Sequence, residues 1–351
     1  MSFRLPARSP TANQCQNMKM KKFINKPENL VPELLEGLAA AYPDKVKLEG
    51  KVVVRATPKD KSKVAVITLG GAGHEPALSG FVGYGMLDAS IVGDIFAAPN
   101  AMTVAEGLRK FKDYAGILLV VLNHAGDVMS ANMALKMAAR EKINVKSVLV
   151  AEDISAGRNA EQKDRRGLAG CIPLIKVAGA AAEEGKSLDE VLAIAEKFNS
   201  RIATLAVAMT GCTHPQNGSP IAELGEDEME IGMGQHGEGG GGKTAIKTAD
   251  ETSEIMFKNL ADAVELKSGE RVFLVINGTG ACTPMEMSIV FRACAKLAEK
   301  MGAKVECGII DEFLTVQEMA GFQMILCVVD DVQLAALKAK SNAPYWTCLG
   351  E

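Results

Sequence analysis

The chain has 351 residues, of which 48% are hydrophobic and 23% charged, and its formal net charge is −4. This balance is ordinary for a globular protein of two or three domains, while the weak negative charge and the 5% of aromatic residues disfavour nucleic acid or an anionic membrane as a partner. No apolar run reaches the ~20 residues of a membrane span. The eight cysteines form no Cys-x-x-Cys pair, so we expect a cytoplasmic protein with reduced thiols and no bound metal.

Residues 1–19 are polar, lack periodicity and contain no apolar signal core. Met20 reads like a natural start. We therefore expect residues 1–19 to form a disordered N-terminal extension that takes no part in the fold.

Strand-like and helix-like segments alternate between residues 20 and 200. Gly116–Leu122 is a continuous apolar run, which suits a strand buried on both faces of a parallel sheet. The alternation predicts a first α/β domain with a parallel core. Strands are predicted at Val52–Ala56, Lys63–Leu69, Gly116–Leu122 and Val145–Val150, and helices at Leu30–Ala41, from Val128 to Arg140, at Ile172–Glu184 and at Leu188–Phe198.

A second series of elements follows a boundary near residue 200. Residues 211–248 are rich in glycine, proline and acidic residues and show little regular pattern, as functional or mobile segments often do. We expect two α/β domains with mixed, mostly parallel sheets, at residues 20–200 and 201–351. Strands are predicted at Ile202–Met209, Arg271–Ile276, Lys304–Ile310 and Gln323–Val329, and helices at Asp250–Val264, Pro284–Met301 and Asp331–Lys340.

His236 lies in the sequence Ile-Gly-Met-Gly-Gln-His-Gly-Glu-Gly-Gly-Gly-Gly at residues 231–242. Glycine lets the backbone take left-handed angles and lets a small molecule come close. An imidazole displayed in this way can act as a base, a ligand or a nucleophile.

Two further polar turns follow predicted strands. Gly70–Pro76 contains His74, and Asn123–Asp127 ends in a carboxylate. Ligands of open α/β sheets gather at the carboxyl ends of the strands. If the two strands are neighbours, His74 and Asp127 face one crevice and form an acid–base pair. The alternative is that the first segment is only a tight turn and that Asp127 only caps a helix beginning at Val128.

Gly237–Thr244 matches the pattern of a phosphate-binding loop, G-x-x-x-x-G-K-[ST]. Such a loop needs a buried strand before it and a helix that starts at the lysine. The segment before it is interrupted by glycines, and no firm helical start follows. A stand-alone ATPase is therefore the weakest of the hypotheses.

Two charged segments have simpler interpretations. The acidic run Glu226–Glu230 could hold Mg²⁺, although such runs are usually solvated. Arg165 and Arg166 could bind an anion, but a solvated loop or an ion pair at an interface is the simpler interpretation.

Several motifs occur in order from about Met20 to the C-terminus: Gly-Gly-Ala-Gly-His-Glu-Pro, Asn-His-Ala-Gly-Asp, Arg-Arg-Gly, Glu-Met-Glu-Ile-Gly-Met-Gly-Gln-His-Gly-Glu and Met-Ala-Gly-Phe. Together they resemble the substrate-binding (K) subunit of dihydroxyacetone kinase. The resemblance implies two α/β domains, a homodimer, and a ketose held on His236 as a covalent hemiaminal. It implies acid–base roles for Asp127 and His74, and substrate contacts from Gly71, Ala72, Gly73, His74 and Asp127.

The resemblance also implies a partner. In that family the nucleotide is carried on a separate helical L subunit or an appended L domain. We therefore expect no cofactor on this chain itself, and ATP, or ADP recharged by a phosphotransferase-system subunit, with Mg²⁺ on the partner.

The chain departs from the family pattern at several polar positions. A usual lysine is replaced by Leu122, a tyrosine by His124, a serine by Ala72 and a proline by Gly239, and the turn before Pro99 lacks its Ser/Thr. The ketose could thus be dihydroxyacetone or a four-carbon sugar such as erythrulose. The loss of the lysine also leaves open a non-catalytic ketose-binding regulator.

Overall fold

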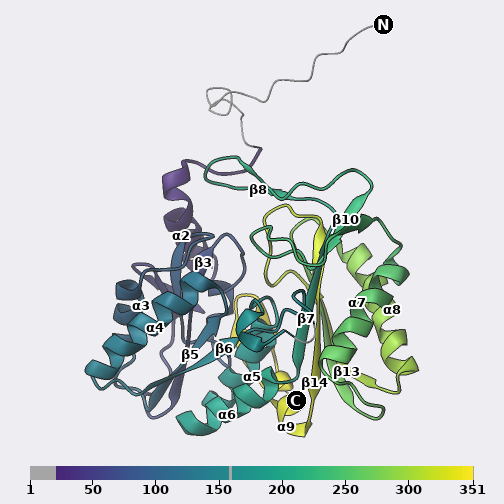
Figure 1. The fold of residues 1–351 in the computed structure, drawn as a ribbon. Coiled ribbons are helices and arrows are strands. Elements are labelled where there is room, and N and C mark those ends of the chain that lie inside the picture. The colour runs from purple at the N-terminus through teal and green to yellow at the C-terminus, as the bar shows by residue number, and fades with distance from the viewer. Residues whose placement is uncertain (1–20, 158–159, 351) are drawn as a thin grey trace, which may run out of the picture.

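A computed structural model describes residues 21–157 and 160–350, so the extension expected at residues 1–19 lies outside the described residues. Two six-stranded sheets stand side by side, with helices between them and on both outer faces (Figure 1). The helices are α2 (Leu30–Ala41), α3 (Ala101–Arg109), α4 (Ala125–Arg140), α5 (Cys171–Glu183), α6 (Leu188–Asn199), α7 (Ala249–Ala263), α8 (Pro284–Lys300) and α9 (Asp331–Lys338), with short 3₁₀ turns at Pro27–Asn29, Ser79–Phe81 and Gln162–Asp164.

The first sheet has the order β1-β2-β4-β3-β5-β6. Its strands β4, β3, β5 and β6 are parallel, while β1 and β2 add an antiparallel edge. These strands are β1 (Val46–Glu49), β2 (Val52–Arg55), β3 (Val64–Ala72), β4 (Ala89–Ile95), β5 (Gly116–Leu122) and β6 (Val145–Val150).

The second sheet has the order β11-β10-β7-β14-β12-β13, and only β12 and β13 are parallel. Its strands are β7 (Ile202–Ala208), β10 (Glu228–Ile231), β11 (Lys243–Ala245), β12 (Arg271–Gly278), β13 (Lys304–Asp311) and β14 (Gly321–Val329), and two small hairpins are β8 (Cys212–Thr213) with β9 (Pro220–Ile221) and β15 (Ser341–Ala343) with β16 (Trp346–Cys348). The mixed α/β class predicted from the sequence is confirmed.

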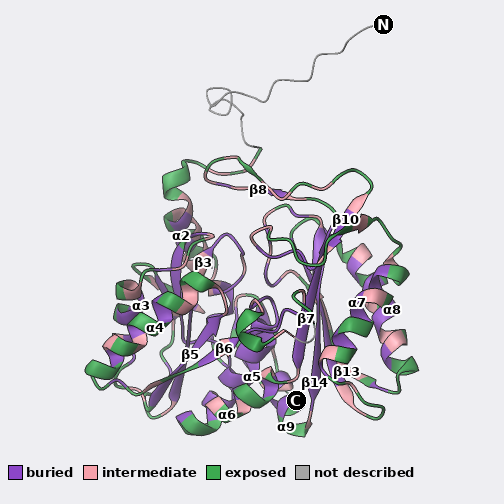
Figure 2. Ribbon diagram, in the orientation of Figure 1, coloured by how far each residue is buried: buried purple, intermediate pink, exposed green. Residues whose placement is uncertain are grey.

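Successive residues of a strand point to opposite faces of its sheet, and in this way the strands contribute to three hydrophobic clusters. On β5, Leu118 and Val120 face the helices between the sheets, whereas Ile117 and Leu119 face α3 and α4. On β12, Val275 faces inward and its neighbours face α7 and α8. Figure 2 shows the buried strands flanked by helices whose outer surfaces are exposed. Both sheets therefore contribute to one central core.

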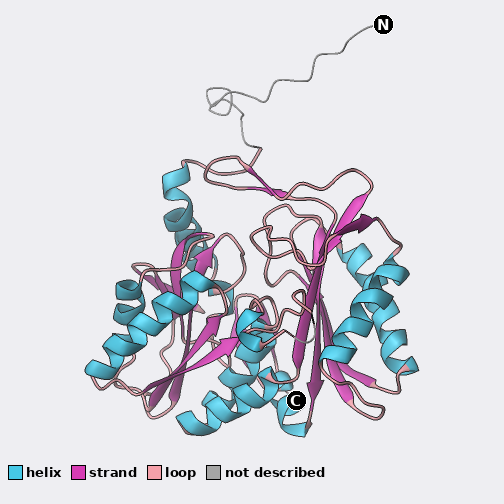
Figure 3. Cartoon of the chain, in the orientation of Figure 1, coloured by secondary structure: helices cyan, strands magenta, loops and turns pink. Residues whose placement is uncertain are grey.

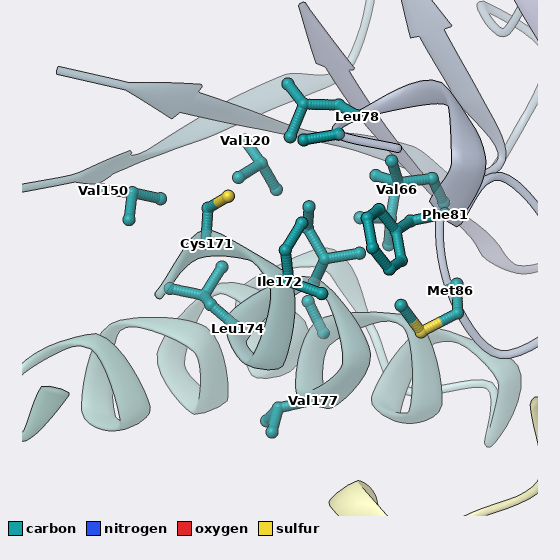
Figure 4. Close-up of a cluster of buried hydrophobic side chains, with 14 of the residues drawn as sticks. Val66, Leu78, Phe81, Met86, Val120, Val150, Cys171, Ile172, Leu174 and Val177 are labelled. Carbon is teal, nitrogen blue, oxygen red and sulfur yellow. The ribbon is translucent and has the colours of Figure 1, made fainter. Parts of the chain in front are cut away.

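Helix α5 is the centre of that core. It is buried on all sides, because it lies between the two sheets (Figure 3). In Figure 4, Cys171, Ile172 and Leu174 of α5 pack beneath Val120 and Val150 of the first sheet. Each such buried aliphatic side chain contributes roughly 1.5–3 kcal/mol to folding.

The C-terminal residues return to the first sheet. The backbone N–H of Asn342 donates to Tyr84, and that of Tyr345 donates to Gly80, at 2.8 and 3.0 Å. The second sheet begins at Ile202, yet the chain after β14 packs against the first half of the molecule. A division into domains near residue 200 stays a prediction.

Strands β1 and β4 of the first sheet, and helix α3, were not predicted from the sequence. In β4, Ser90, Gly93 and Asp94 interrupt both the apolar continuity and the alternation that a strand pattern requires. This omission matters because β4 ends beside the pocket described next.

The helices that lie within residues 21–157 and 160–350 are all too short or too polar to cross a membrane. The described cysteines are all free thiols: Cys171, Cys212, Cys282, Cys294, Cys307, Cys327 and Cys348.

Candidate functional site

A cavity of about 940 Å³ opens at the carboxyl ends of β3, β4 and β5. Since β3 and β5 are adjacent and parallel, the turns that follow them meet at the same edge of the sheet. The loop after β10 and Leu314 complete the cavity from the second sheet. The sequence-predicted residues among its lining are Gly71, His74, Asp127 and His236.

The loop after β10 carries His236 across to the first sheet. Gly232 and Gly237 have φ angles of +92° and +77°, a region that glycine adopts without steric cost. The backbone N–H of Gly234 donates to the carbonyl of Glu238 at 2.7 Å. This tight turn presents the imidazole of His236 to the cavity.

Arg166 fixes that loop to the first half of the chain. Its Nε donates to Asp153 at 2.7 Å, and Nη2 donates to Ser155 and to the carbonyl of Gly232, both at 2.7 Å. The Asp153 side chain is only 1% exposed and that of Arg166 18% exposed. Of the two simpler interpretations of Arg166, the solvated loop is therefore wrong, whereas an ion pair is present, with Asp153. The guanidinium joins two segments of the same chain.

A chain of hydrogen bonds runs through the two central imidazoles. Nδ1 of His74 lies 2.9 Å from the carbonyl oxygen of Thr315, and its Nε2 lies 3.1 Å from Nε2 of His236. Nδ1 of His236 lies 3.1 Å from Oε1 of Glu238. The carbonyl and the carboxylate can only accept, so each outer Nδ1 must carry a proton.

Three contacts thus require three protons, whereas two neutral imidazoles supply two. When both rings are neutral, the two Nε2 atoms face each other with lone pairs. The gap between His74 and His236 then needs a proton, or a molecule that places an electrophilic atom or a hydrogen-bond donor there.

Burial determines the charge of His74. The residue is 5% exposed, and burial, followed by repulsion from the neighbouring His236 ring, lowers the pKa of His74 to about 3. His74 is therefore neutral at pH 7 and presents Nε2 as an acceptor. Glu238 is an anion: burial opposes its charge, but hydrogen bonds from the ring of His236 and from backbone N–H groups lower the pKa of Glu238 to about 2.

Asp127 lies in the first turn of α4, which begins at Ala125 with His124 at the N-cap. Asp127 is therefore not the cap of a helix starting at Val128. Its Oδ1 is buried and has no hydrogen-bond partner among the described residues. Burial raises the pKa of Asp127 to about 7, a value at which a carboxylate can take a proton near neutral pH.

Phe96 is a site residue that the sequence analysis missed. Its ring lies 4.9 Å from that of His74 and 5.7 Å from that of His236, and its φ is +55°. A bulky residue in this left-handed region is uncommon and occurs most often at functional sites. No motif marks it, because β4 itself was not recognised.

His124 and Leu122 also line the cavity. Nε2 of His124 lies 2.8 Å from the carbonyl oxygen of Gly167, and its ring lies 5.2 Å from that of His236. Burial, then repulsion from the His236 ring, lowers the pKa of His124. Leu122, which replaces the lysine of the family pattern, makes this wall apolar.

The predicted glycine-rich contacts are only partly at the cavity. Gly71 lines it, and a Cβ at this position would lie 2.7 Å from the backbone nitrogen of Ala97, so the close approach of the two turns requires glycine. Ala72 and Gly73 are not among the described residues that line the cavity.

The structure contradicts the phosphate-binding loop. Lys243–Ala245 is strand β11, paired antiparallel with β10, and the next helix begins at Ala249. Nζ of Lys243 donates to the carbonyl of Glu223 at 2.8 Å. In the acidic run, Glu226 and Asp227 are exposed, as expected for a solvated segment, whereas Glu230 is buried and accepts from the N–H of Gly240 at 3.0 Å.

Residues 36–345 match the Dak1 domain. The chain belongs to the Dak1 family. Among its Dak1 relatives is the PTS-dependent dihydroxyacetone kinase 1, dihydroxyacetone-binding subunit DhaK, of Listeria innocua, which is 36% identical over 313 residues that cover 89% of this chain and 95% of that protein.

Two other proteins that this chain resembles have names that describe different roles. L-erythrulose kinase of Pectobacterium atrosepticum is 35% identical over 329 residues, covering 93% of this chain and 56% of that protein. A solved structure named as the dihydroxyacetone kinase operon co-activator Dha-DhaQ superposes with a TM-score of 0.85 at 30% identity, covering 91% of this chain and 99% of that one. The scaffold therefore occurs in kinases and in a regulator.

Proposed function

We propose that this chain is the ketose-binding subunit of a kinase and holds a short ketose covalently on His236. The observation that carries the proposal is the pair of facing imidazoles: Nε2 of His236 lies 3.1 Å from Nε2 of His74 at the wall of the cavity. Glu238 holds a proton on Nδ1 of His236, which leaves the lone pair of Nε2 free to attack a carbonyl carbon.

The addition can be followed atom by atom. The Nε2 lone pair of His236 forms a bond to the keto carbon, and the π electrons of the C=O move to oxygen, which takes a proton from solvent. The ring becomes cationic and keeps its Nδ1 proton in the hydrogen bond to Glu238, 3.1 Å away. The carboxylate of Glu238 therefore balances the positive charge of the hemiaminal ring. Nε2 of His74 is an acceptor and receives the hydrogen bond of a substrate hydroxyl.

Asp127 is the proposed general base of the transfer. Its unpartnered Oδ1 is buried beside the cavity, where it can accept the proton of the terminal hydroxyl as that oxygen attacks the phosphoryl group. Because the transition state of phosphoryl transfer is loose, fixing the alcohol in place contributes more than a strong base. The nucleotide, as ATP or as ADP recharged by a phosphotransferase-system subunit, would lie with Mg²⁺ on a partner L subunit.

The proposal is tested by mass spectrometry of the purified chain with ketoses of three to five carbons, at collision energies that strip non-covalently bound sugar. We expect an increment equal to the full mass of the ketose, since a hemiaminal forms without loss of water, whereas a lysine Schiff base loses one water. Glycerol, which has no carbonyl, should give none. His236→Ala should lose the increment and His214→Ala should keep it. An increment that persists in His236→Ala would contradict the assignment.

A second candidate is a ketose-binding regulator without transfer activity. Leu122 favours it, because an apolar side chain at the cavity replaces a polar contact of the family pattern, and one solved Dak1 structure is named as a co-activator. Turnover with an L subunit decides between the two: an adduct without phosphorylation would favour the regulator.

Three further properties belong to the same proposal. Dihydroxyacetone and erythrulose are the first ketoses to test, since both appear in the names of relatives. A homodimer and a cytoplasmic location are proposed from the family resemblance and from the described cysteines, which are free thiols. Sedimentation of the purified chain tests the dimer.

A further inference from the structure

We propose that the cavity also binds a divalent transition-metal ion, with Zn²⁺ as the best fit, between His124, His236 and Glu238. One ligand-type atom from each residue lies within 4.8 Å of the other two. Two imidazoles and one carboxylate are a donor set of known zinc sites that keep a fourth position open to water. The ligands come from the N-cap of α4 and from the loop after β10, so the ion would join the two halves of the site.

The spacing of two of the ligands already suits one ion. Nδ1 of His236 and Oε1 of Glu238 are 3.1 Å apart. Bonds of about 2.0–2.2 Å to zinc place two ligands of one ion roughly 3–4 Å apart. The ring of His124 is centred 5.2 Å from that of His236, and its ligand atom lies within 4.8 Å of those of His236 and Glu238.

The hydrogen bonds around the three residues supply the outer contacts that metal ligands need. Nε2 of His124 lies 2.8 Å from the carbonyl oxygen of Gly167 and 3.0 Å from the side-chain amide of Gln235. The carbonyl can only accept, and the amide can turn its otherwise unpartnered oxygen to this nitrogen, so Nε2 carries the proton and Nδ1 keeps its lone pair. With the ion on Nδ1 of His236, its Nε2–H donates to Nε2 of His74, whose own Nδ1–H donates to Thr315. Ligating histidines are typically oriented by such contacts on the opposite ring nitrogen.

Metal and ketose require different tautomers of one ring. The ketose adduct uses the lone pair of Nε2 with the proton on Nδ1, whereas the metal occupies Nδ1 and moves the proton to Nε2. The two states are therefore mutually exclusive, and Zn²⁺ should inhibit adduct formation until a chelator removes it. This consequence rests on the proposed function, but the metal site itself does not.

The sequence predicted no metal, because no cluster of closely spaced ligands is present. The two ligand-bearing segments are far apart in the chain and meet only through the fold. His124 is the informative residue, since it stands where the family pattern has a tyrosine, which is a much weaker ligand for zinc.

The experiment measures Zn²⁺ directly. The metal-free full chain is dialysed against Zn²⁺, and bound metal is quantified by elemental analysis, with Co²⁺ absorption as a second readout of imidazole ligation. We expect one ion per chain. His124→Tyr and Glu238→Gln should each weaken binding at least about tenfold. His214→Ala is the matched control, because this ring packs on Phe96 at 5.3 Å outside the trio, and it should bind like the parent chain.

Two outcomes would overturn the metal site: no binding by the parent chain, or unchanged binding in both His124→Tyr and Glu238→Gln. Thermal melts of the variants show whether each is folded, and Glu238→Gln changes a side chain that is 41% exposed, so it should fold. The ketose adduct is measured on metal-free protein. If the chain binds zinc but forms no ketose adduct, only the proposed function is refuted. If it forms the adduct but binds no zinc, only the metal site is refuted.

Discussion

Nε2 of His74 lies 3.1 Å from Nε2 of His236, although the two residues are 162 positions apart. The other ring nitrogen of each residue already has a hydrogen-bond partner. Nδ1 of His74 faces the carbonyl oxygen of Thr315, and Nδ1 of His236 faces the carboxylate of Glu238. The contact therefore joins the two sheets at a point where the hydrogen bonds are incomplete without a further proton or ligand. Catalytic pockets commonly combine such unsatisfied groups with a rigid surround.

His74→Ala should weaken ketose binding without abolishing the adduct. The variant removes one acceptor for a substrate hydroxyl, and a hydrogen bond of this kind contributes about 1 kcal/mol, or roughly fivefold in affinity. Isothermal titration with dihydroxyacetone measures the change, and His214→Ala serves as the control for loss of an imidazole near Phe96. An unchanged affinity would show that His74 does not contact the substrate.

The sequence predicts part of this site, because the patterns that mark that part lie within short continuous segments. Apolar runs ending in Gly70–Pro76 and Asn123–Asp127 predicted that His74 and Asp127 would meet if their strands were neighbours, and β3 and β5 are paired in parallel. Phe96 could not be found in this way, and neither could the contacts of Arg166, although the sequence marks Arg166 as a candidate for an ion pair. Phe96 follows a strand without a clear period, and Arg166 acts through contacts with residues 153 and 232, which no periodicity encodes.

Arg166→Ala should both destabilise the fold and weaken ketose binding. Removing the guanidinium leaves Asp153, whose side chain is 1% exposed, as a buried unpaired carboxylate, which costs about 3–5 kcal/mol. It also frees the carbonyl of Gly232 and so loosens the loop that carries His236. Chemical denaturation and ketose titration measure the two effects.

Arg166→Lys provides a discriminating control. A lysine keeps the charge but cannot donate simultaneously from Nε and Nη2 in a fixed plane. It should recover part of the stability and little of the ketose affinity. Full recovery of both would mean that charge alone, not the forked geometry, positions the loop.

Asp127→Asn should separate binding from turnover. The amide keeps the size of the side chain but cannot take a proton, so the adduct should persist while phosphorylation with an L subunit falls by about 10²–10⁴. Steady-state assays and native mass spectrometry of the same preparation measure the two quantities. Near-normal turnover would remove Asp127 from the mechanism.

The pH dependence of turnover follows from the same residue. Burial raises the pKa of Asp127 to about 7, and the ionised form is the base. Turnover should therefore rise as pH increases through about 7 and then level off. The residual activity of Asp127→Asn should lack this step, and a profile that falls over the same range would contradict the role of base.

Glu152 should make the stability of the protein depend on pH. The residue is 2% exposed and accepts from the N–H groups of Leu168 and Gly170 at 3.0 and 2.8 Å. Burial outweighs these bonds and raises the pKa of Glu152 to about 7 from an ordinary 4.5. Between these pH values the folded state binds more protons than the unfolded state, so this contribution to stability is present below about pH 4.5 and is lost as pH rises to 7.

The contribution of His74 to stability has the opposite pH dependence and is present in both proteins. Comparing Glu152→Gln with the parent chain therefore isolates the contribution of Glu152 to the free energy of unfolding. The pKa of His74 is lowered to about 3, so its contribution is lost as pH falls below about 6.5. A glutamine cannot ionise, yet its oxygen can still accept from the backbone. The difference in unfolding free energy, variant minus parent, should therefore increase by about 3 kcal/mol between pH 4.5 and 7. Urea denaturation at several pH values measures it, and a difference that stays constant across this range would mean that Glu152 is ionised throughout in the folded protein.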